Sequence, residues 1–140
     1  MQTTLCLIKP DATRAGHAGT ILARLQSEGF EVLGMRKLRL SRRTAEGFYA
    51  VHQERPFFPE LMDFMTSGPI FALALRRDNA ILHLRDVIGA TDPAEADAGT
   101  IRADLGTSKQ ENCVHASDGV DTAAEEIPFF FSRADLLETS

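Results

Sequence analysis

The run of six apolar residues at positions 70–75, Ile-Phe-Ala-Leu-Ala-Leu, constrains the fold of this chain more than any other stretch. It follows the turn residues Thr-Ser-Gly-Pro and has the length of a strand. Because it lacks polar alternation, it is typical of a strand buried on both faces, and we expect it at the centre of a sheet. A shorter apolar run at positions 5–8 predicts a second strand of this kind.

Helical periodicity predicts two packing helices. Apolar residues recur at helical spacing in residues 17–28, which end before Gly29. The same spacing recurs in residues 79–88, which end before Gly89 and which Asp78 is placed to cap. Between the first helix and the central strand, residues 30–40 alternate imperfectly and predict a long strand.

The remaining elements complete a recognisable order. A helix capped by Ser41 and a short helix at residues 61–65 form a helical hairpin around a Pro-bounded phenylalanine pair. After a loop at 105–111 comes a short strand at 113–114, then a helix capped by Asp118 that ends or kinks at Pro128. Residues 132–140 have the character of a tail. The order predicts an α+β fold, a ferredoxin-like βαββαβ antiparallel sheet with an added helical hairpin and C-terminal helix.

Length and composition exclude several classes of protein. With 140 residues, 44% hydrophobic and 25% charged, we expect one globular domain spanning residues 1–140. A net charge of −5 disfavours a dedicated nucleic-acid binder, which needs a basic face. The apolar run near the N-terminus is too short for a signal peptide or membrane span, so a cytoplasmic location is expected. The two cysteines are interpreted as reduced thiols, and no ligand spacing predicts a protein metal site.

A histidine with an unusual polar setting is the leading candidate for chemistry. His115 lies between the strand at 113–114 and the polar turn at 117–119, which would hold its ring at a sheet edge facing a cleft. An imidazole that is neutral near pH 7 can attack phosphorus without a separate base. Glu126, on the inward side of the last helix, is a carboxylate that needs a partner. The alternative is that His115 is a surface or capping residue, as a single histidine usually is.

Two arginines and a threonine are candidates for binding phosphate. Arg85 falls off the apolar stripe of its helix, and the segment 89–104 places Thr91 and Arg102 on short helices and turns. Guanidinium groups form paired, charge-assisted hydrogen bonds with phosphate oxygens. Since the chain has no glycine-rich phosphate loop, side chains must hold any phosphate. The alternative for Arg85 is an ordinary solvated charge.

The segment Asn112-x-x-His115-Ala116-Ser117-Asp118 closely resembles the active-site signature of the nucleoside diphosphate kinases, Asn-x-x-His-Gly-Ser-Asp. Residues 8–12, 89–93 and 99–104 resemble other motifs of that family, in the same order along essentially the whole chain. The resemblance implies catalytic roles for His115, Glu126, Ser117 and Tyr49, and nucleotide-binding roles for Lys9, Phe57, Leu61, Arg85, Thr91, Arg102 and Asn112.

The family resemblance also implies a mechanism. The histidine takes the γ-phosphoryl group of a nucleoside triphosphate, typically ATP, and passes it to a nucleoside diphosphate in ping-pong kinetics. Mg²⁺ is expected on the nucleotide phosphates and no metal on the protein itself. Phe57 and Leu61 would sandwich the base, and since stacking is largely indifferent to base identity, broad base and sugar tolerance follows. A homo-oligomer built from dimers, with tetramer or hexamer favoured, is implied as well.

Three departures from the family pattern bear on this expectation. Ala116 replaces a glycine, which would strain the turn only if that position needs a positive φ. Gly119 stands where the family often has a serine, and Pro128 shortens the last helix. Two other readings stay open: a nucleotide-binding regulator without turnover, and an interaction domain in which the histidine only satisfies a core hydrogen bond. The other histidines (His17, His52 and His83) are predicted to be surface residues.

Overall fold

The computed structural model describes residues 1–138 and contains one antiparallel sheet of four strands in the order β2-β3-β1-β4. The strands are β1 (Gln2–Ile8), β2 (Glu31–Leu38), β3 (Ile70–Arg77) and β4 (Val114–Ala116). The two apolar runs form the inner strands β1 and β3, as predicted, and their residues are buried on both faces. The ferredoxin-like α+β prediction is therefore confirmed.

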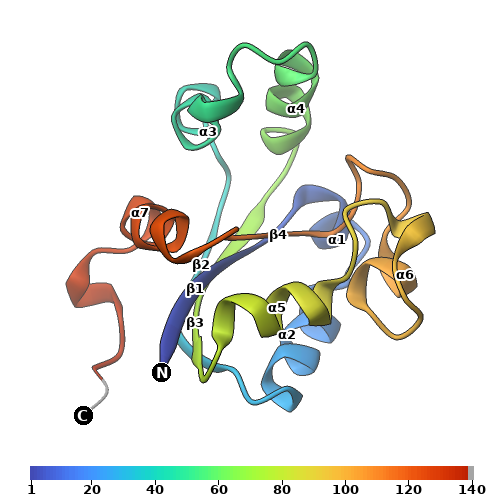
Figure 1. Ribbon diagram of the computed structural model, residues 1–140. Coiled ribbons are helices and arrows are strands. Elements are labelled where there is room, and N and C mark those ends of the chain that lie inside the picture. The colour runs from blue at the N-terminus through green and yellow to red at the C-terminus, as the bar shows by residue number, and fades with distance from the viewer. Residues whose placement is uncertain (139–140) are drawn as a thin grey trace.

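Helices cover both faces of this sheet (Figure 1). The helices are α1 (Pro10–Arg14), α2 (Ala18–Ser27), α3 (Arg42–Phe48), α4 (Phe58–Met65), α5 (Ala80–Ile88), α6 (Ile101–Leu105) and α7 (Val120–Phe130). Three short 3-10 helices are η1 (Ala50–His52), η2 (Pro93–Glu95) and η3 (Arg133–Asp135). Helices α3 and α4 contact each other and stand together at the top of the view, as the predicted hairpin.

Strand alternation sends successive side chains of β1 into two separate hydrophobic cores. Leu5 and Leu7 join a cluster with residues of α3, α4 and α7. Cys6 and Ile8 join a second cluster with residues of α2, α5 and α6. The predicted packing helices thus lie on one face of the sheet, and the added hairpin and last helix lie on the other. Both cysteines are free and buried, in agreement with the reduced thiols expected.

Two predicted helix caps are wrong. Asn79, at φ 53°, is the N-cap of α5, while Asp78 lies 3.5 Å from the N-terminal amine. Asp118 does not cap α7, because its carboxylate pairs with Arg85 and the helix begins after Gly119.

The C-terminal part of the chain is more ordered than predicted. Pro128 lies inside α7, which continues to Phe130 because the buried Phe130 and Phe131 anchor its last turn in the core. Part of the segment predicted as a tail lies beside β2, where the N–H of Leu137 donates to the carbonyl of Leu33 at 2.8 Å. Residues 139–140 lie outside the described part of the chain.

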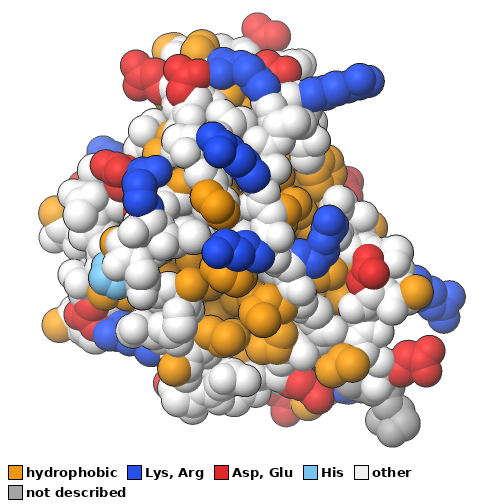
Figure 2. All heavy atoms as spheres, turned by 180° about the vertical axis from the view of Figure 1, so that it is seen from behind, with side chains coloured by type: hydrophobic (Ala, Val, Ile, Leu, Met, Phe, Trp, Pro, Cys, Tyr) orange, Lys and Arg blue, Asp and Glu red, His pale blue; other side chains and the backbone are white. Residues whose placement is uncertain are grey.

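Edge strand β2 leaves apolar surface exposed. Met35, in the middle of the strand, is 52% exposed. It helps to line an apolar hollow of about 160 Å³ with Ala18 and Leu22 of α2 and Phe71 of β3. Seen from behind, the molecule shows hydrophobic side chains gathered on one face with Lys and Arg around them (Figure 2). Within residues 1–138, no helix has the length and apolar character needed to span a membrane.

Candidate active site

His115 lies in the middle of β4, paired with Leu7 of β1. Its neighbours Val114 and Ala116 are buried in the core that contains α2 and α5. By strand alternation the imidazole points to the opposite face, toward α3 and α7, where it is 22% exposed. Ala116 is in regular strand conformation, and its φ is not positive, so the departure from glycine introduces no backbone strain.

The imidazole is oriented by a carboxylate on α7. Nε2 of His115 lies 3.0 Å from Oε1 of Glu126, and the hydroxyl of Ser117 donates to the same oxygen at 2.7 Å. Burial raises the pKa of Glu126, but the hydrogen bonds from His115 and Ser117, with the nearby imidazole, outweigh it and leave the pKa below the usual range. An ionised carboxylate only accepts hydrogen bonds, so Nε2 must carry the proton and Nδ1 keeps its lone pair.

Two aromatic rings pack edge-on against the imidazole. The ring of Phe48 lies 5.3 Å from that of His115, and the ring of Tyr49 lies 6.1 Å away. Burial, together with the charge of Glu126, raises the pKa of Tyr49, so its hydroxyl stays protonated. Tyr49 was a predicted site residue. Phe48 was not, although its position beside Tyr49 at the end of the hairpin helix was a signal that could have identified it.

Lys9 lies where β1 ends, beside the loop that leads to His115. Its Nζ donates to the side-chain oxygen of Asn112 at 2.8 Å and to the carbonyl of Gln110 at 2.7 Å. Burial lowers the pKa of this amine to about 8, although the negative charge of Asp11 opposes the shift. Asn112 in turn donates from Nδ2 to the carbonyl of Thr91 at 2.9 Å. Three predicted nucleotide-binding residues therefore form one hydrogen-bonded chain.

The guanidinium of Arg102 is braced by main-chain carbonyls. It donates to the oxygens of Gly89, Asn112 and Val114 at 3.1, 3.3 and 2.7 Å. Gly89 also allows the close packing of Thr100, the N-cap of α6, because a Cβ at position 89 would lie 2.5 Å from the hydroxyl of Thr100. Burial and then the charge of Arg85 lower the pKa of Arg102.

The remaining predicted residues lie around this centre. Arg85, on the exposed side of α5, donates to Asp118 at 3.0 Å, close to the turn after His115. Asp118 was expected only as a cap, and its pairing with Arg85 was not predicted. Phe57, at the start of α4, is 47% exposed and lies 5.8 Å from the ring of His52. Leu61 packs partly against the core one turn later. The structure thus places a half-exposed phenylalanine on the hairpin wall.

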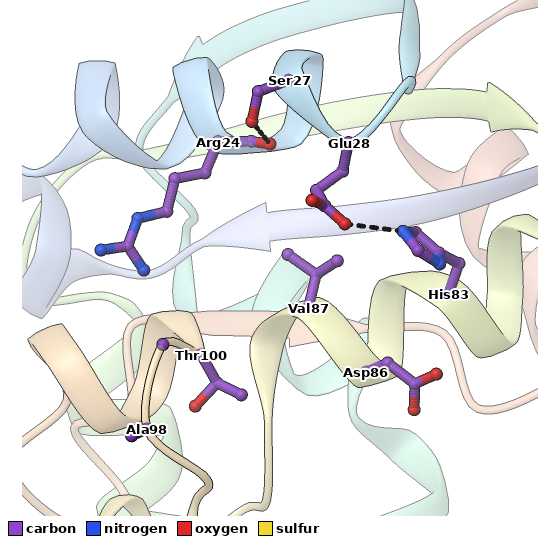
Figure 3. A pocket seen from close by; sticks show the side chains of 9 residues that line it. Arg24, Ser27, Glu28, His83, Asp86, Val87, Ala98 and Thr100 are labelled. Carbon is purple, nitrogen blue, oxygen red and sulfur yellow. Dashed lines mark hydrogen bonds and ion pairs between the residues drawn. The ribbon is translucent and has the colours of Figure 1, made fainter.

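Away from this site, a pocket of about 450 Å³ lies between α2 and α5 (Figure 3). We refer to it as the α2–α5 pocket; it is lined by Arg24, Ser27, Glu28, His83, Asp86, Val87, Ala98, Gly99 and Thr100. Nε2 of His83 lies 2.9 Å from Oε1 of Glu28 inside it. No residue predicted for chemistry or nucleotide binding lines this pocket. Within the part of the chain that the structure describes, no group of three or more His, Cys, Asp or Glu residues could hold a metal ion.

The chain matches the family model described as nucleoside diphosphate kinase over residues 2–136. It is 52% identical over 137 residues to a nucleoside diphosphate kinase of Geotalea daltonii, covering 98% of this chain and 100% of that protein. Identity to the enzyme of Syntrophotalea carbinolica is 55%, with the same coverage.

Solved structures give the same result. The nucleoside diphosphate kinase of Aquifex aeolicus superimposes with a TM-score of 0.95 at 43% identity, covering 97% of this chain and 99% of that one. A halophilic nucleoside diphosphate kinase from Halobacterium salinarum, solved in complex with CDP, also gives 0.95 at 35% identity, covering 99% and 93%.

Proposed function

The chain belongs to the nucleoside diphosphate kinase family, and on that premise we propose that His115 carries the phosphoryl group between nucleotides. The enzyme transfers the γ-phosphoryl of a nucleoside triphosphate to a nucleoside diphosphate through a phosphohistidine. One observation supports the role of His115 above all. Its Nε2 is engaged by Glu126 at 3.0 Å, which leaves the Nδ1 lone pair available on an oriented ring.

The reaction has two half-reactions at one site. In the first, Nδ1 of His115 attacks the γ-phosphorus, the bond to the β-phosphate oxygen breaks, and the nucleoside diphosphate leaves. In the second, the terminal oxygen of another nucleoside diphosphate attacks the same phosphorus and the P–N bond breaks. Positive charge that develops on the imidazole is stabilised by Glu126, whose carboxylate is also held by Ser117 at 2.7 Å. Since one product leaves before the second substrate binds, the kinetics are ping-pong.

Lys9, Arg85, Arg102 and Thr91 bind the phosphates. The amine of Lys9 and the guanidinium of Arg102 are held in place by backbone carbonyls before any nucleotide arrives, so little side-chain entropy remains to be lost on binding. Each phosphoryl transfer moves negative charge between oxygens, and fixed cations stabilise that charge. Asn112 contacts the sugar hydroxyls; its hydrogen bond from Lys9 supports this role, because it joins the amide to the phosphate-binding amine.

Mg²⁺ reaches this site on the nucleotide. Within residues 1–138 no cluster of carboxylates forms a metal site, and the candidate site offers cations and an amide group instead, which fits an ion carried by phosphate oxygens and water. When bound with the nucleotide, the ion would neutralise phosphate charge. The protein groups then need only to bind the outer oxygens of the complex.

Phe57 and Leu61 form the base-binding wall. A ring that is 47% exposed on the hairpin is available for stacking, and stacking accepts any base. The enzyme therefore tolerates different bases and sugars. The relative from Halobacterium salinarum was solved with CDP, a pyrimidine nucleotide, which supports a site not restricted to purines.

The enzyme acts as one domain, residues 1–140, within a homo-oligomer assembled from dimers, as a tetramer or hexamer. The apolar hollow beside the half-exposed Met35 supports this assembly, because an exposed apolar patch favours contact with a second copy. We place the enzyme in the cytoplasm, where nucleoside triphosphates are made and consumed.

The test is the intact mass of the protein after brief exposure to ATP and Mg²⁺, kept out of acid. We expect one added phosphoryl group, discharged by GDP, and none in His115→Ala. Absence of the adduct while ATP still binds would contradict the transfer and favour a nucleotide-binding regulator. A dimer or larger species in light scattering, reduced by Met35→Glu, checks the assembly.

A further inference from the structure

Cys113 adopts a backbone conformation that L-amino acids rarely adopt. Its φ is +75°, and the N–H of Val114 donates to the carbonyl of Asn112 at 2.9 Å across it. This is a three-residue γ-turn of the strained kind, in which the Cβ of a non-glycine residue is crowded. Strain of this type persists only where the surroundings hold it.

Both polar groups of the Cys113 backbone are held by the segment that follows β1. Its N–H donates to Oδ2 of Asp11 at 3.1 Å, and its carbonyl accepts from the N–H of Lys9 at 2.8 Å. Asp11 and Cys113 are 102 positions apart in sequence. The carboxylate is therefore a specific tertiary contact to the turn.

The γ-turn lies between two functional groups. On one side is Asn112, whose side chain binds Lys9 and the carbonyl of Thr91. On the other side, two residues away, is His115. If the turn relaxes, the direction of the chain changes between the sugar-binding amide and the nucleophile, so both are displaced together.

The thiol of Cys113 offers no competing explanation. It is 1% exposed, and burial and the charge of Asp11 raise its pKa to about 11. It is neither accessible nor ionised near neutral pH. Asp11 could instead serve only α1 as an acidic residue in its first turn, but that helix has five residues. The second carboxylate oxygen of Asp11, Oδ1, is buried and has no hydrogen-bond partner among the described residues. The hydrogen bond from the N–H of Cys113 to Oδ2 is therefore the one that holds this carboxylate.

We propose that Asp11 is a positioning residue for phosphoryl transfer, holding the strained turn at Cys113 so that His115 and Asn112 face the same nucleotide. The inference rests on the proposed role of His115. It assigns to Asp11 a role in the chemical step without contact with the reacting atoms. Its carboxylate acts through one backbone N–H.

The test compares rates of phosphohistidine formation at saturating ATP and pH 7, so that changes in nucleotide affinity do not enter. We expect Asp11→Ala to slow the step by about 10- to 100-fold, as a small displacement of a reacting group does. Asp11→Asn keeps an oxygen acceptor and should stay within about fivefold of the parent, since the hydrogen bond survives.

The decisive variant is Asp11→Ala combined with Cys113→Gly. Glycine adopts this φ without strain, so the turn no longer needs the carboxylate and at least about half of the lost rate, on a logarithmic scale, should return. Asp121→Ala is the matched control: it removes an exposed first-turn acid from α7 and should leave the rate within about twofold. Thermal unfolding of each variant identifies those that fail to fold.

Two outcomes overturn the inference. If Asp11→Ala reacts as fast as the parent, the carboxylate does not position the site. If it is slow and glycine restores nothing in a folded double variant, Asp11 acts by another route. Failure of the parent to form phosphohistidine is a different result and contradicts the proposed function instead.

Discussion

Within residues 1–138, two His–Glu pairs with nearly the same N–O distance lie on opposite sides of the sheet. His115 and Glu126 are 3.0 Å apart, and His83 and Glu28 in the α2–α5 pocket are 2.9 Å apart. Judged by distance alone, either imidazole is oriented by a carboxylate. The pairs differ in what surrounds them, and that difference is our reason for proposing His115, and not His83, as the nucleophile.

Burial and support differ first. His115 is fixed on a strand between two buried neighbours, and Glu126 is 19% exposed with a second hydrogen bond from Ser117. His83 projects from a helix, Glu28 is 44% exposed, and the nearby ring is that of Phe30 at 5.8 Å. A partner that is so exposed exchanges its hydrogen bond with water easily.

The available positive charge differs even more. Lys9 and Arg102 are buried beside the loop that carries Asn112, and this loop leads into β4. The arginine that lines the α2–α5 pocket is Arg24, which is engaged by Asp104 at 2.6 Å, and Asp86 adds a further negative charge. A phosphate would be repelled there. We therefore expect an oriented imidazole to be insufficient without cations that bind the group to be transferred.

Removal of each imidazole should give the largest contrast. His115→Ala should lower the turnover of phosphoryl transfer from ATP to GDP by at least about 10⁴-fold, because no other group forms the covalent intermediate. His83→Ala should stay within about twofold, as a surface substitution does. A coupled assay of ADP formation measures the turnover of both variants. Comparable losses in the two variants would break the distinction between the pairs.

Neutralising each carboxylate should give a smaller difference in turnover, with the larger loss again at the pair that contains His115. Glu126→Gln removes the charge that holds the Nε2 proton and should lower turnover by about 10- to 100-fold. Glu28→Gln, measured beside it, should change turnover by less than about twofold. If Glu126→Gln retained full rate, orientation by the carboxylate would be unnecessary and the comparison would rest on the cations alone.

The buried cation near His115 should make nucleotide binding depend on pH. Lys9 has a pKa lowered to about 8, so it is protonated below that value and loses its charge above it. We expect the KM for ATP to rise above pH 8, by at most about tenfold per pH unit, until the pKa of the bound form is reached. Lys9→Met should have a raised KM that lacks this rise. A parent KM constant from pH 7 to 9.5 would contradict the role of the amine.

The pair in the α2–α5 pocket should contribute little to stability. A double-mutant cycle of His83→Ala and Glu28→Ala, followed by urea unfolding at pH 7, should give a coupling free energy below about 1 kcal/mol. The reason is exposure of both side chains to water. A coupling above about 2 kcal/mol would show that this pair is a structural element as specific as that of His115.

Most of the sheet could be predicted because its signals are local. The apolar runs at 5–8 and 70–75 and the helical spacing in residues 17–28 and 79–88 determine burial whatever the rest of the chain does. The errors concern residues with two available partners. Asp78 and Asp118 can each cap a helix or pair with a cation. In the folded chain Asp78 pairs with the N-terminal amine and Asp118 pairs with Arg85. The sequence predicts that the last helix ends or kinks at Pro128. The helix continues to Phe130, because the packing of Phe130 and Phe131 outweighs the missing N–H of Pro128.

The sequence by itself determined the buried strands and the packing helices, since periodicity is a local property, and its resemblance to a family supplied the list of candidate residues for binding or transferring a phosphoryl group. Only the tertiary structure decided which nitrogen of His115 is free, that Phe48 packs on its ring, and that Asp11 reaches Cys113 across 102 positions. These contacts join β1, β4, α3 and α7, and their distances follow from how the two cores pack against one sheet. No local pattern records that packing, because it depends on side chains far apart in the chain filling the same space.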